Sequence, residues 1–306
     1  MTTLPTLPVL YINLDRCKER DVLTKCTLSQ MGIADDDVIR VRAIDMDDVY
    51  DKRVGECDGM HYDIRPNSKG FMPRPKEIAI ILSHIRALQT IPYTCDMAVI
   101  MEDDMSFQYI RDWNKYIYDI VTNAPPDWSI IKLHSSVPNV IEKNIAQYKN
   151  GTPYLKLNCT DDVQSAGCYI IKKDAAATLL SRYYNQTTDT YSFPYKDEYC
   201  ICETVIFTLP NMYAYTEPSI CARENNITCM RNRNVADVRS NMVIHAYWRS
   251  VLGAEFVAKL AQNCMTQCSE IIELNKDVIP VVKKKIGIRT MGVMQQRARG
   301  PVRVNL

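Results

Sequence analysis

The sequence predicts an α/β fold with a Rossmann-like mixed sheet flanked by helices, followed by a helical and basic C-terminal extension. The first observation is a strand, helix, strand pattern over residues 7–45. Such units build parallel sheets, and ligands bind where their strands end. The second is "DMAVIMEDD", residues 96–104, whose near-continuous apolar run is typical of a strand buried on both faces. With 306 residues, the chain can form one large α/β domain or two small ones.

The first three elements follow one another closely. The apolar, β-branched run at residues 7–15 predicts a central strand. Residues 16–33 carry apolar side chains at helical spacing, and Gly32 suits the end of that helix. The run "VIRVRAID", residues 38–45, predicts the second strand.

A glycine- and proline-containing stretch separates this unit from the next helix. Residues 51–75 predict a long loop, and long loops within compact domains are often functional lids. Residues 76–91 then place apolar side chains on one face of a helix. The buried strand 96–104 follows, so its three carboxylates stand at its carboxyl end.

The second half of the chain is predicted to complete the sheet and then become helical. Its strands and helices are predicted over residues 128–134, 166–173, 173–184 and 250–264. We divide the chain into a domain over 1–250 and an extension over 251–306. Residues 281–306 are rich in Lys and Arg and contain no Asp or Glu. This tail could contact a membrane surface or a protein partner, or could simply be solvated.

Composition excludes several classes of protein. The formal net charge of +1 argues against a general polyanion or nucleic-acid binder. No apolar run approaches the ~20 residues of a spanning helix, and the start lacks a signal-peptide pattern. We therefore expect a cytoplasmic protein whose 12 cysteines are mostly free thiols.

Common nucleotide and hydrolase signatures are missing from the sequence. It contains no GxGxxG, no GxxxxGK followed by Ser or Thr, no HExxH and no GxSxG. The whole chain has 10 glycines, which disfavours a glycine-rich phosphate cradle. A bound phosphate would have to be held by a metal ion and basic side chains.

The acidic run after the buried strand is the first candidate site. Alternate side chains of an extended chain share a face, so Glu102 and Asp104 point together while Asp103 points away. Two carboxylates on one side suit a hard divalent cation that also binds substrate phosphates. A solvated or salt-bridged acidic turn explains the same pattern equally well.

Other candidates come from the histidines and a later acidic patch. His84 lies in a predicted helix beside Ser83, and His245 follows an apolar stretch and could complete a metal site. For each of these histidines, a packed and hydrogen-bonded structural role is more common than a functional one. Asp197 and Glu198, in "YKDEYCICE", are candidates for a general base, although a surface loop is the alternative.

Several stretches together resemble glycosyltransferase family 25, which includes lipopolysaccharide-synthesis and procollagen galactosyltransferase-like enzymes. "YINLDRCKER" is similar to that family's "INLDRxxxR", "PKEIAIILSHIRALQ" to "GEIGCALSHxxxx", and "VIMEDDMSF" to "LILEDDxxF". "SAGCYIIKKDAAATLL" resembles "GTxAYxISxxAAxxLL", and "KDEYC" resembles "xDxxL". The match covers residues 9 to about 220. It departs from the family at Ala79-Ile80, where the family has Gly-Cys, and in the longer loop over 49–75.

The resemblance implies a GT-A fold that uses a nucleotide sugar, usually UDP-linked, with Mn²⁺ or Mg²⁺ at the acidic motif. It implies metal ligation by Glu102 and Asp104, with His245 added by analogy with GT-A enzymes in general. The residues that it places at the donor site are Asn13, Leu14, Arg16, Arg20, Asp45, Ser83, His84 and Asp103.

The function predicted on this basis is metal-dependent transfer of a hexose from a UDP-sugar to a hydroxyl of a glycan, glycolipid or glycoprotein, with inversion. Asp197 would be the base and Glu198 its substitute. Lumenal members of the family need a signal peptide, so the sequence favours a bacterial or viral origin. Two alternatives stay open: a catalytically silent nucleotide-sugar or glycan-binding protein on the same fold, and a metal-dependent phosphodiester or nucleotidyl enzyme.

Overall fold

The structure, a computed structural model, describes residues 7–49, 54–65, 73–158, 165–194, 202–223 and 235–274. A seven-stranded sheet forms its centre, in the order β2-β1-β5-β9-β7-β12-β8. Its strands are β1 (Val9–Asn13), β2 (Val38–Arg42), β5 (Met97–Glu102), β7 (Ile130–Lys132), β8 (Tyr154–Leu157), β9 (Cys168–Lys172) and β12 (Met212–Tyr215). β1 runs parallel to β2 and β5, whereas β9 is antiparallel to both β5 and β7. The predicted mixed α/β sheet is therefore confirmed.

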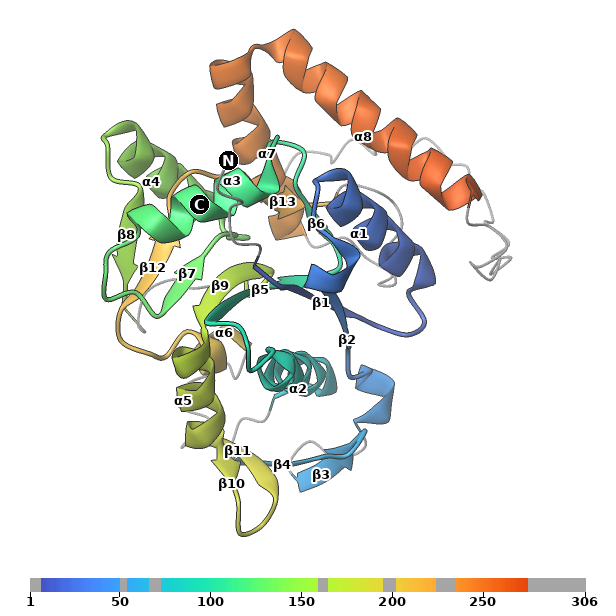
Figure 1. The fold of residues 1–306 in the computed structure, drawn as a ribbon, viewed down its shortest axis with the longest axis vertical. Helices are drawn as coiled ribbons and strands as arrows, with labels where there is room; N and C mark the ends of the chain where they lie inside the picture. The colour runs from blue at the N-terminus through green and yellow to red at the C-terminus, as the bar shows by residue number, and fades with distance from the viewer. Residues whose placement is uncertain are drawn as a thin grey trace, which may run out of the picture.

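Helices cover both faces of this sheet (Figure 1). The helices are α1 (Lys18–Gln30), α2 (Pro75–Thr90), α3 (Trp113–Asn123), α4 (Pro138–Lys149), α5 (Lys173–Tyr183), α6 (Cys202–Ile206), α7 (Val235–Leu252) and α8 (Ala254–Leu274). In β1, Leu10 and Ile12 pack on the face covered by α2, α5 and α6, whereas Val9 and Tyr11 pack on the face covered by α1 and α3. The strand is buried on both sides, which explains its unbroken apolar run.

The stretch predicted as a loop over 51–75 contains regular structure. β3 (Val54–Cys57) and β4 (Met60–Arg65) form an antiparallel hairpin within a second sheet, ordered β10-β11-β4-β3. The other two strands of that sheet are β10 (Tyr184–Asn185) and β11 (Thr190–Pro194). Asp58 and Gly59 both have positive φ, at 52° and 77°, as a two-residue hairpin turn requires. The loop prediction is wrong for residues 54–65, because the two glycines there belong to a hairpin strand and its turn rather than to a loop.

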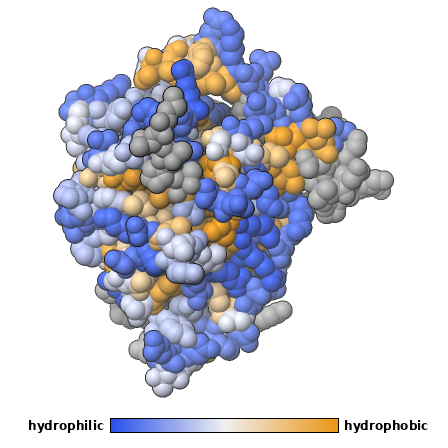
Figure 2. All heavy atoms as spheres, in the orientation of Figure 1, coloured by the Kyte–Doolittle hydropathy of each residue, from blue (hydrophilic) through white to orange (hydrophobic). Residues whose placement is uncertain are grey.

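The C-terminal part of the described chain is helical, as predicted, but it is divided. Gly253, with a φ of 90°, separates α7 from α8, so the helical stretch predicted over 250–264 is interrupted at this residue. α8 packs on α1 through Leu23 and Ile271. Figure 2 shows apolar residues gathered where α7 meets α8, and Val251 and Phe256 are exposed there. The predicted domain boundary at 250 falls inside α7, and the division into domains stays a prediction.

Short elements that the sequence did not predict complete the fold. α3, α4, β8 and β12 lie outside every predicted range, and β6 (Met105–Ser106) pairs with β13 (Cys221–Ala222) directly after the acidic run. Cys17 is disulfide-bonded, which corrects the expectation of a free thiol there, whereas Cys168 and five other described cysteines form no disulfide. In the part of the chain that the structure describes, no helix is long and apolar enough to cross a membrane.

Candidate active site

The parallel arrangement of β1, β2 and β5 brings their carboxyl ends to one edge of the sheet. Ile12 is in register with Glu102, and Asn13 is in register with Arg42. The segment after β1, the segment after β2 and the acidic turn after β5 therefore meet. This edge is where an α/β sheet binds its ligands.

Asp103 is held inside the protein. Asn13 Nδ2 donates to one carboxylate oxygen at 2.7 Å, and Arg20 Nη1 donates to the other at 2.6 Å. Thr24 Oγ1 also donates to the Asp103 carbonyl oxygen at 3.1 Å. Asp103 is 6% exposed and Asn13 1%. These two residues, predicted to bind the donor, instead use their polar groups to fix the acidic turn onto β1 and α1.

Arg20 offsets the charge of two of the three carboxylates. Its Nη1 lies 3.4 Å from Asp104 Oδ2 in addition to its contact with Asp103. Burial opposes its ionisation, but the charges of Asp104 and Asp103 prevail and raise the pKa of Arg20. The guanidinium therefore stays charged beneath the turn.

Asp104 is only partly neutralised. Burial and the charge of Glu102 raise the pKa of Asp104 to about 7, against the opposing charge of Arg20. Its Oδ1 is buried and has no hydrogen-bond partner among the described residues. An oxygen of this kind costs free energy until a ligand contacts it, so Asp104 is the residue of the turn best prepared to bind something else.

Glu102 faces α2. Its Oε1 lies 3.6 Å from His84 Nε2, and its side chain is 36% exposed. Burial works against its ionisation, but the facing His84 ring prevails and holds the pKa of Glu102 below its usual range. Glu102 therefore presents a charged carboxylate between the helix and the open space beside the turn.

That space is a cavity of about 620 Å³, large enough for a ligand of nucleotide size. Of the predicted site residues, those that line it are Leu14, Arg16, Arg20, Ser83, His84 and all three carboxylates. Its apolar wall includes Ile44, Met46 and Ile80. The cavity thus combines carboxylates and cations with an apolar surface.

Two other predicted donor-site residues support the cavity wall. Ser83 Oγ accepts from Ile44 N at 2.8 Å and donates to Ala79 O at 2.7 Å, so it ties the segment after β2 to α2. Asp45 pairs with Arg16 and caps the following turn by accepting from Asp47 N. Ser83 and Asp45 shape the pocket through these contacts.

His245 lies elsewhere in the fold. It stands within α7, and its Nδ1 hydrogen-bonds to the Tyr109 hydroxyl, while Tyr109 stacks on Trp248. Within the described ranges, no group of three or more His, Cys, Asp or Glu side chains could hold a metal. The structure therefore does not bring His245 together with Glu102 and Asp104 as a third metal ligand, because α7 packs this histidine against Tyr109. Metal ligation by Glu102 and Asp104 stays a prediction.

The predicted bases, Asp197 and Glu198, lie outside the described residues, as does the basic tail over 281–306. Glu203, from the same acidic patch, is described. It accepts a hydrogen bond from Ser165 N at 2.5 Å, next to the start of β9.

The structure adds three charged residues that the sequence analysis did not select. Lys76 and Asp47 line the cavity. Burial and the charge of Glu102 raise the pKa of Asp237, at the start of α7, against the charge of Lys76. Lys76 and Asp47 could have been found, since Lys76 lies in the first turn of α2 and Asp47 in the segment that follows β2. The position of Asp237 instead depends on the packing of α7.

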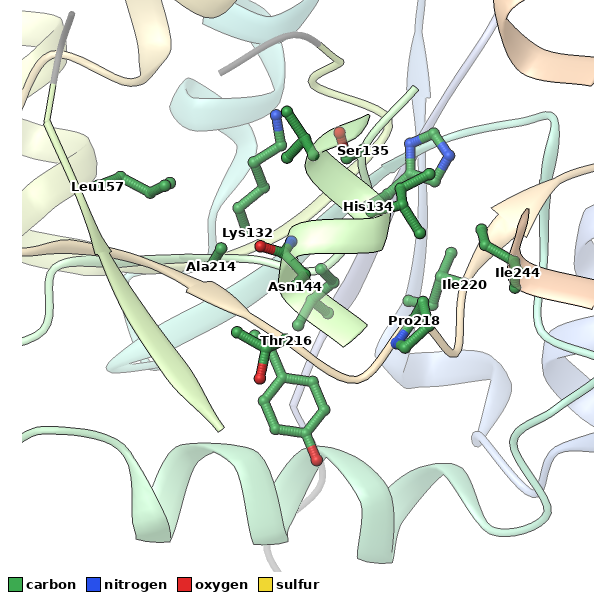
Figure 3. Close-up of a pocket in the computed structure, with 14 residues that line it drawn as sticks. Lys132, His134, Ser135, Asn144, Leu157, Ala214, Thr216, Pro218, Ile220 and Ile244 are labelled. Carbon is green, nitrogen blue, oxygen red and sulfur yellow. The ribbon is translucent and has the colours of Figure 1, made fainter. Parts of the chain in front are cut away.

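A second, much smaller cavity of about 30 Å³ lies beyond β7 (Figure 3). His134 and Asn144 line it, and the buried Asn144 Oδ1 has no hydrogen-bond partner in the described part of the chain. The space suffices for one or two waters rather than for a substrate. His134 Nδ1 instead pairs with Ser165 Oγ at 2.7 Å.

Comparisons with known proteins give structural likenesses only. No protein-family model matches the chain, and no curated protein matches it. Mouse xyloside xylosyltransferase 1, in its apo form, is 10% identical, with a TM-score of 0.29 over 57% of this chain and 69% of the other. An active-site mutant of LgtC is 9% identical, with a TM-score of 0.30 over 77% of this chain and 95% of the other. Both are glycosyltransferases, but likeness at this level decides neither substrate nor reaction.

Removing the buried cation should destabilise the fold. Arg20→Gln leaves Asp103 without its charged partner and should cost about 3–5 kcal/mol of unfolding free energy in urea. Arg42→Gln is the matched control, because Arg42 is 55% exposed in its ion pairs and should cost less than about 1 kcal/mol. Adding Asp103→Asn to Arg20→Gln should recover part of the loss. Equal costs for Arg20→Gln and Arg42→Gln would contradict this assignment.

His134 should make stability depend on pH. Burial, assisted by the charge of Lys132, lowers the pKa of His134 to about 4. Between that value and the unfolded pKa of about 6.5, the unfolded chain binds a proton that the folded chain does not. Unfolding free energy should therefore fall by about 2 kcal/mol between pH 7 and pH 5 from this residue alone.

Urea titrations at the two pH values would measure this loss. His134→Asn should remove that part of the pH dependence, whereas the same change at the exposed His61 should not. An unchanged pH dependence in His134→Asn would show that folding does not lower the pKa of His134.

Proposed function

We propose that the protein is a metal-dependent glycosyltransferase that moves a hexose from a UDP-sugar to a hydroxyl of a glycan or glycoconjugate, with inversion. The observation that carries this proposal is the unpartnered carboxylate oxygen of Asp104 at the cavity edge, with Glu102 beside it. The sequence resemblance to glycosyltransferase family 25 supplies the reaction, and membership of that family is part of the proposal.

The residues present fit a divalent cation. Glu102 and Asp104 offer the hard oxygen ligands that Mg²⁺ and Mn²⁺ prefer, and one or two carboxylates are the usual protein share when substrate phosphates complete the site. Such an ion would neutralise charge on the departing diphosphate. Asp103 would not take part, because both of its oxygens are already bound.

The rest of the cavity suits the other parts of a nucleotide sugar. Arg16 and Lys76 put positive charge on the wall, where phosphate oxygens could bind. Leu14, Ile44 and Met46 give an apolar surface for a nucleobase. Asp197 would take the proton from the acceptor hydroxyl, with Glu198 as the alternative base, while the hydroxyl attacks the anomeric carbon from the face opposite the leaving group.

Thermal melts should detect the site directly. UDP and Mn²⁺ together should raise the midpoint, since a ligand at ~100 times its dissociation constant stabilises by about 2.7 kcal/mol. Asp104→Asn should abolish the joint shift. Asp127→Asn is a control, because Asp127 is an exposed aspartate that binds Tyr213 outside the cavity. No shift in the wild type, or an equal shift in Asp104→Asn, would remove the basis of the proposal.

The base assignment has a separate test. Asp197→Asn should leave UDP affinity nearly unchanged but lower transfer by about 10²-fold or more, as expected for a group that acts only in the transition state. Radiolabelled sugar transfer and calorimetry with UDP would measure the two quantities. A parallel fall in UDP affinity would show that Asp197 contributes to binding or folding instead.

Two activity measurements distinguish this proposal from its alternatives. Turnover or slow hydrolysis of a UDP-sugar would exclude a silent binding protein. Cleavage of a sugar-free phosphodiester or nucleotide, with UDP-sugars left intact, would favour the phosphodiester or nucleotidyl enzyme.

A further inference from the structure

A polar pair lies in the core directly behind Glu102. Tyr169, in β9, is 0% exposed and His84, in α2, is 1% exposed. The Tyr169 hydroxyl lies 3.1 Å from His84 Nδ1, and the two rings stack with centroids 5.9 Å apart. Phe207 packs edge-on against Tyr169 at 5.5 Å. Buried polar groups in such apolar surroundings destabilise the folded protein unless they form hydrogen bonds.

The far side of the His84 ring faces the cavity. Nε2 is buried and has no hydrogen-bond partner in the described chain, and the Glu102 carboxylate lies just beyond hydrogen-bond range at 3.6 Å. Both residues line the cavity. A small shift of the Glu102 side chain, which is partly exposed, would close this contact.

The hydrogen-bond chemistry favours one proton arrangement. A tyrosine hydroxyl can donate to Nδ1, and the proton of a neutral ring then resides on Nε2, facing Glu102. The reverse arrangement would set the Nε2 lone pair against a carboxylate. Burial raises the pKa of Tyr169, so its hydroxyl keeps the proton that it donates.

We propose that Tyr169 and His84 form a hydrogen-bond relay that positions the Glu102 carboxylate at the edge of the cavity. His84 is then a positioning residue rather than a direct contact of the ligand. By binding one oxygen of Glu102, it leaves the other directed at the cavity. Binding of a divalent cation by this second Glu102 oxygen rests on the proposed function. The relay itself belongs to the metal-free protein.

The metal-free protein can be tested by NMR. The chain has 4 histidines, so protein labelled with ¹⁵N-histidine gives a spectrum simple enough to assign through single substitutions. The His84 ring should accept the Tyr169 hydrogen bond at Nδ1 and carry its proton on Nε2. Glu102→Gln should shift the His84 Nε2–H resonance, and Tyr169→Phe should mix the two tautomers.

Tyr183→Phe is the matched control, since it removes a buried hydroxyl bound to Val205 O at 2.9 Å, outside the cavity. It should leave the His84 signals unchanged. A His84 ring protonated on Nδ1, or Nε2–H signals that ignore Glu102→Gln, would overturn the relay.

Calorimetric titration of Mn²⁺ with UDP present tests the consequence for binding. Tyr169→Phe and His84→Asn should weaken Mn²⁺ affinity by about 10- to 100-fold, the usual effect of losing an outer hydrogen-bond partner of a metal ligand. His84→Gln should retain more affinity, because its amide nitrogen reaches the place of Nε2, whereas that of Asn reaches the place of Nδ1. Equal affinity in all variants would overturn the relay.

The two measurements separate the two proposals. If wild-type protein binds no Mn²⁺, the proposed function fails, and the tautomer of His84 still decides the relay. If wild-type protein binds Mn²⁺ and the NMR response to Glu102→Gln is missing, the relay fails while the proposed function stands.

Discussion

The buried contact of Arg20 and Asn13 with Asp103 is the constraint on which the candidate site depends. Three consecutive carboxylates at the end of a buried strand repel one another and raise each other's pKa values unless cations offset them. The fold meets this demand with α1, which brings Arg20 and Thr24 beneath the turn. Fixing the middle carboxylate inward leaves its two neighbours at the cavity edge, where Glu102 faces His84 and Asp104 keeps an oxygen without a partner.

The predicted site residues therefore have different roles in the structure: some bond within the protein and others line the cavity. Asn13, Asp103 and Ser83 use their polar groups within the protein, so they set the geometry of the pocket. Glu102, Asp104, Arg16 and Lys76 line the cavity with charged groups, and Arg16 also pairs with Asp45. Such a division is common where a site must hold charged groups close together, because each charge that contacts a ligand needs others to position it.

The sequence predicted the strands and helices that carry the site because their apolar patterns are long and regular. The buried runs of β1 and β5 and the amphipathic face of α2 each extend over several residues, so their ends, and the residues at them, could be placed. Short strands such as β8 and β12 carry too little pattern, and the β3–β4 hairpin depended on interpreting Asp58-Gly59 as a turn. The contact of His245 with Tyr109 depends on long-range packing, which one sequence does not encode locally.

The central claim is that the outward carboxylates of this turn hold a divalent cation together with a diphosphate. A crystal of the protein grown with UDP and Mn²⁺, with data collected at the manganese absorption edge, tests it most directly. We predict one strong anomalous peak in the cavity, within bonding distance of Asp104 and of a UDP phosphate oxygen, about 2.0–2.2 Å for such ligands. UDP bound without a peak at Asp104, or a peak at another group of side chains, would contradict the claim.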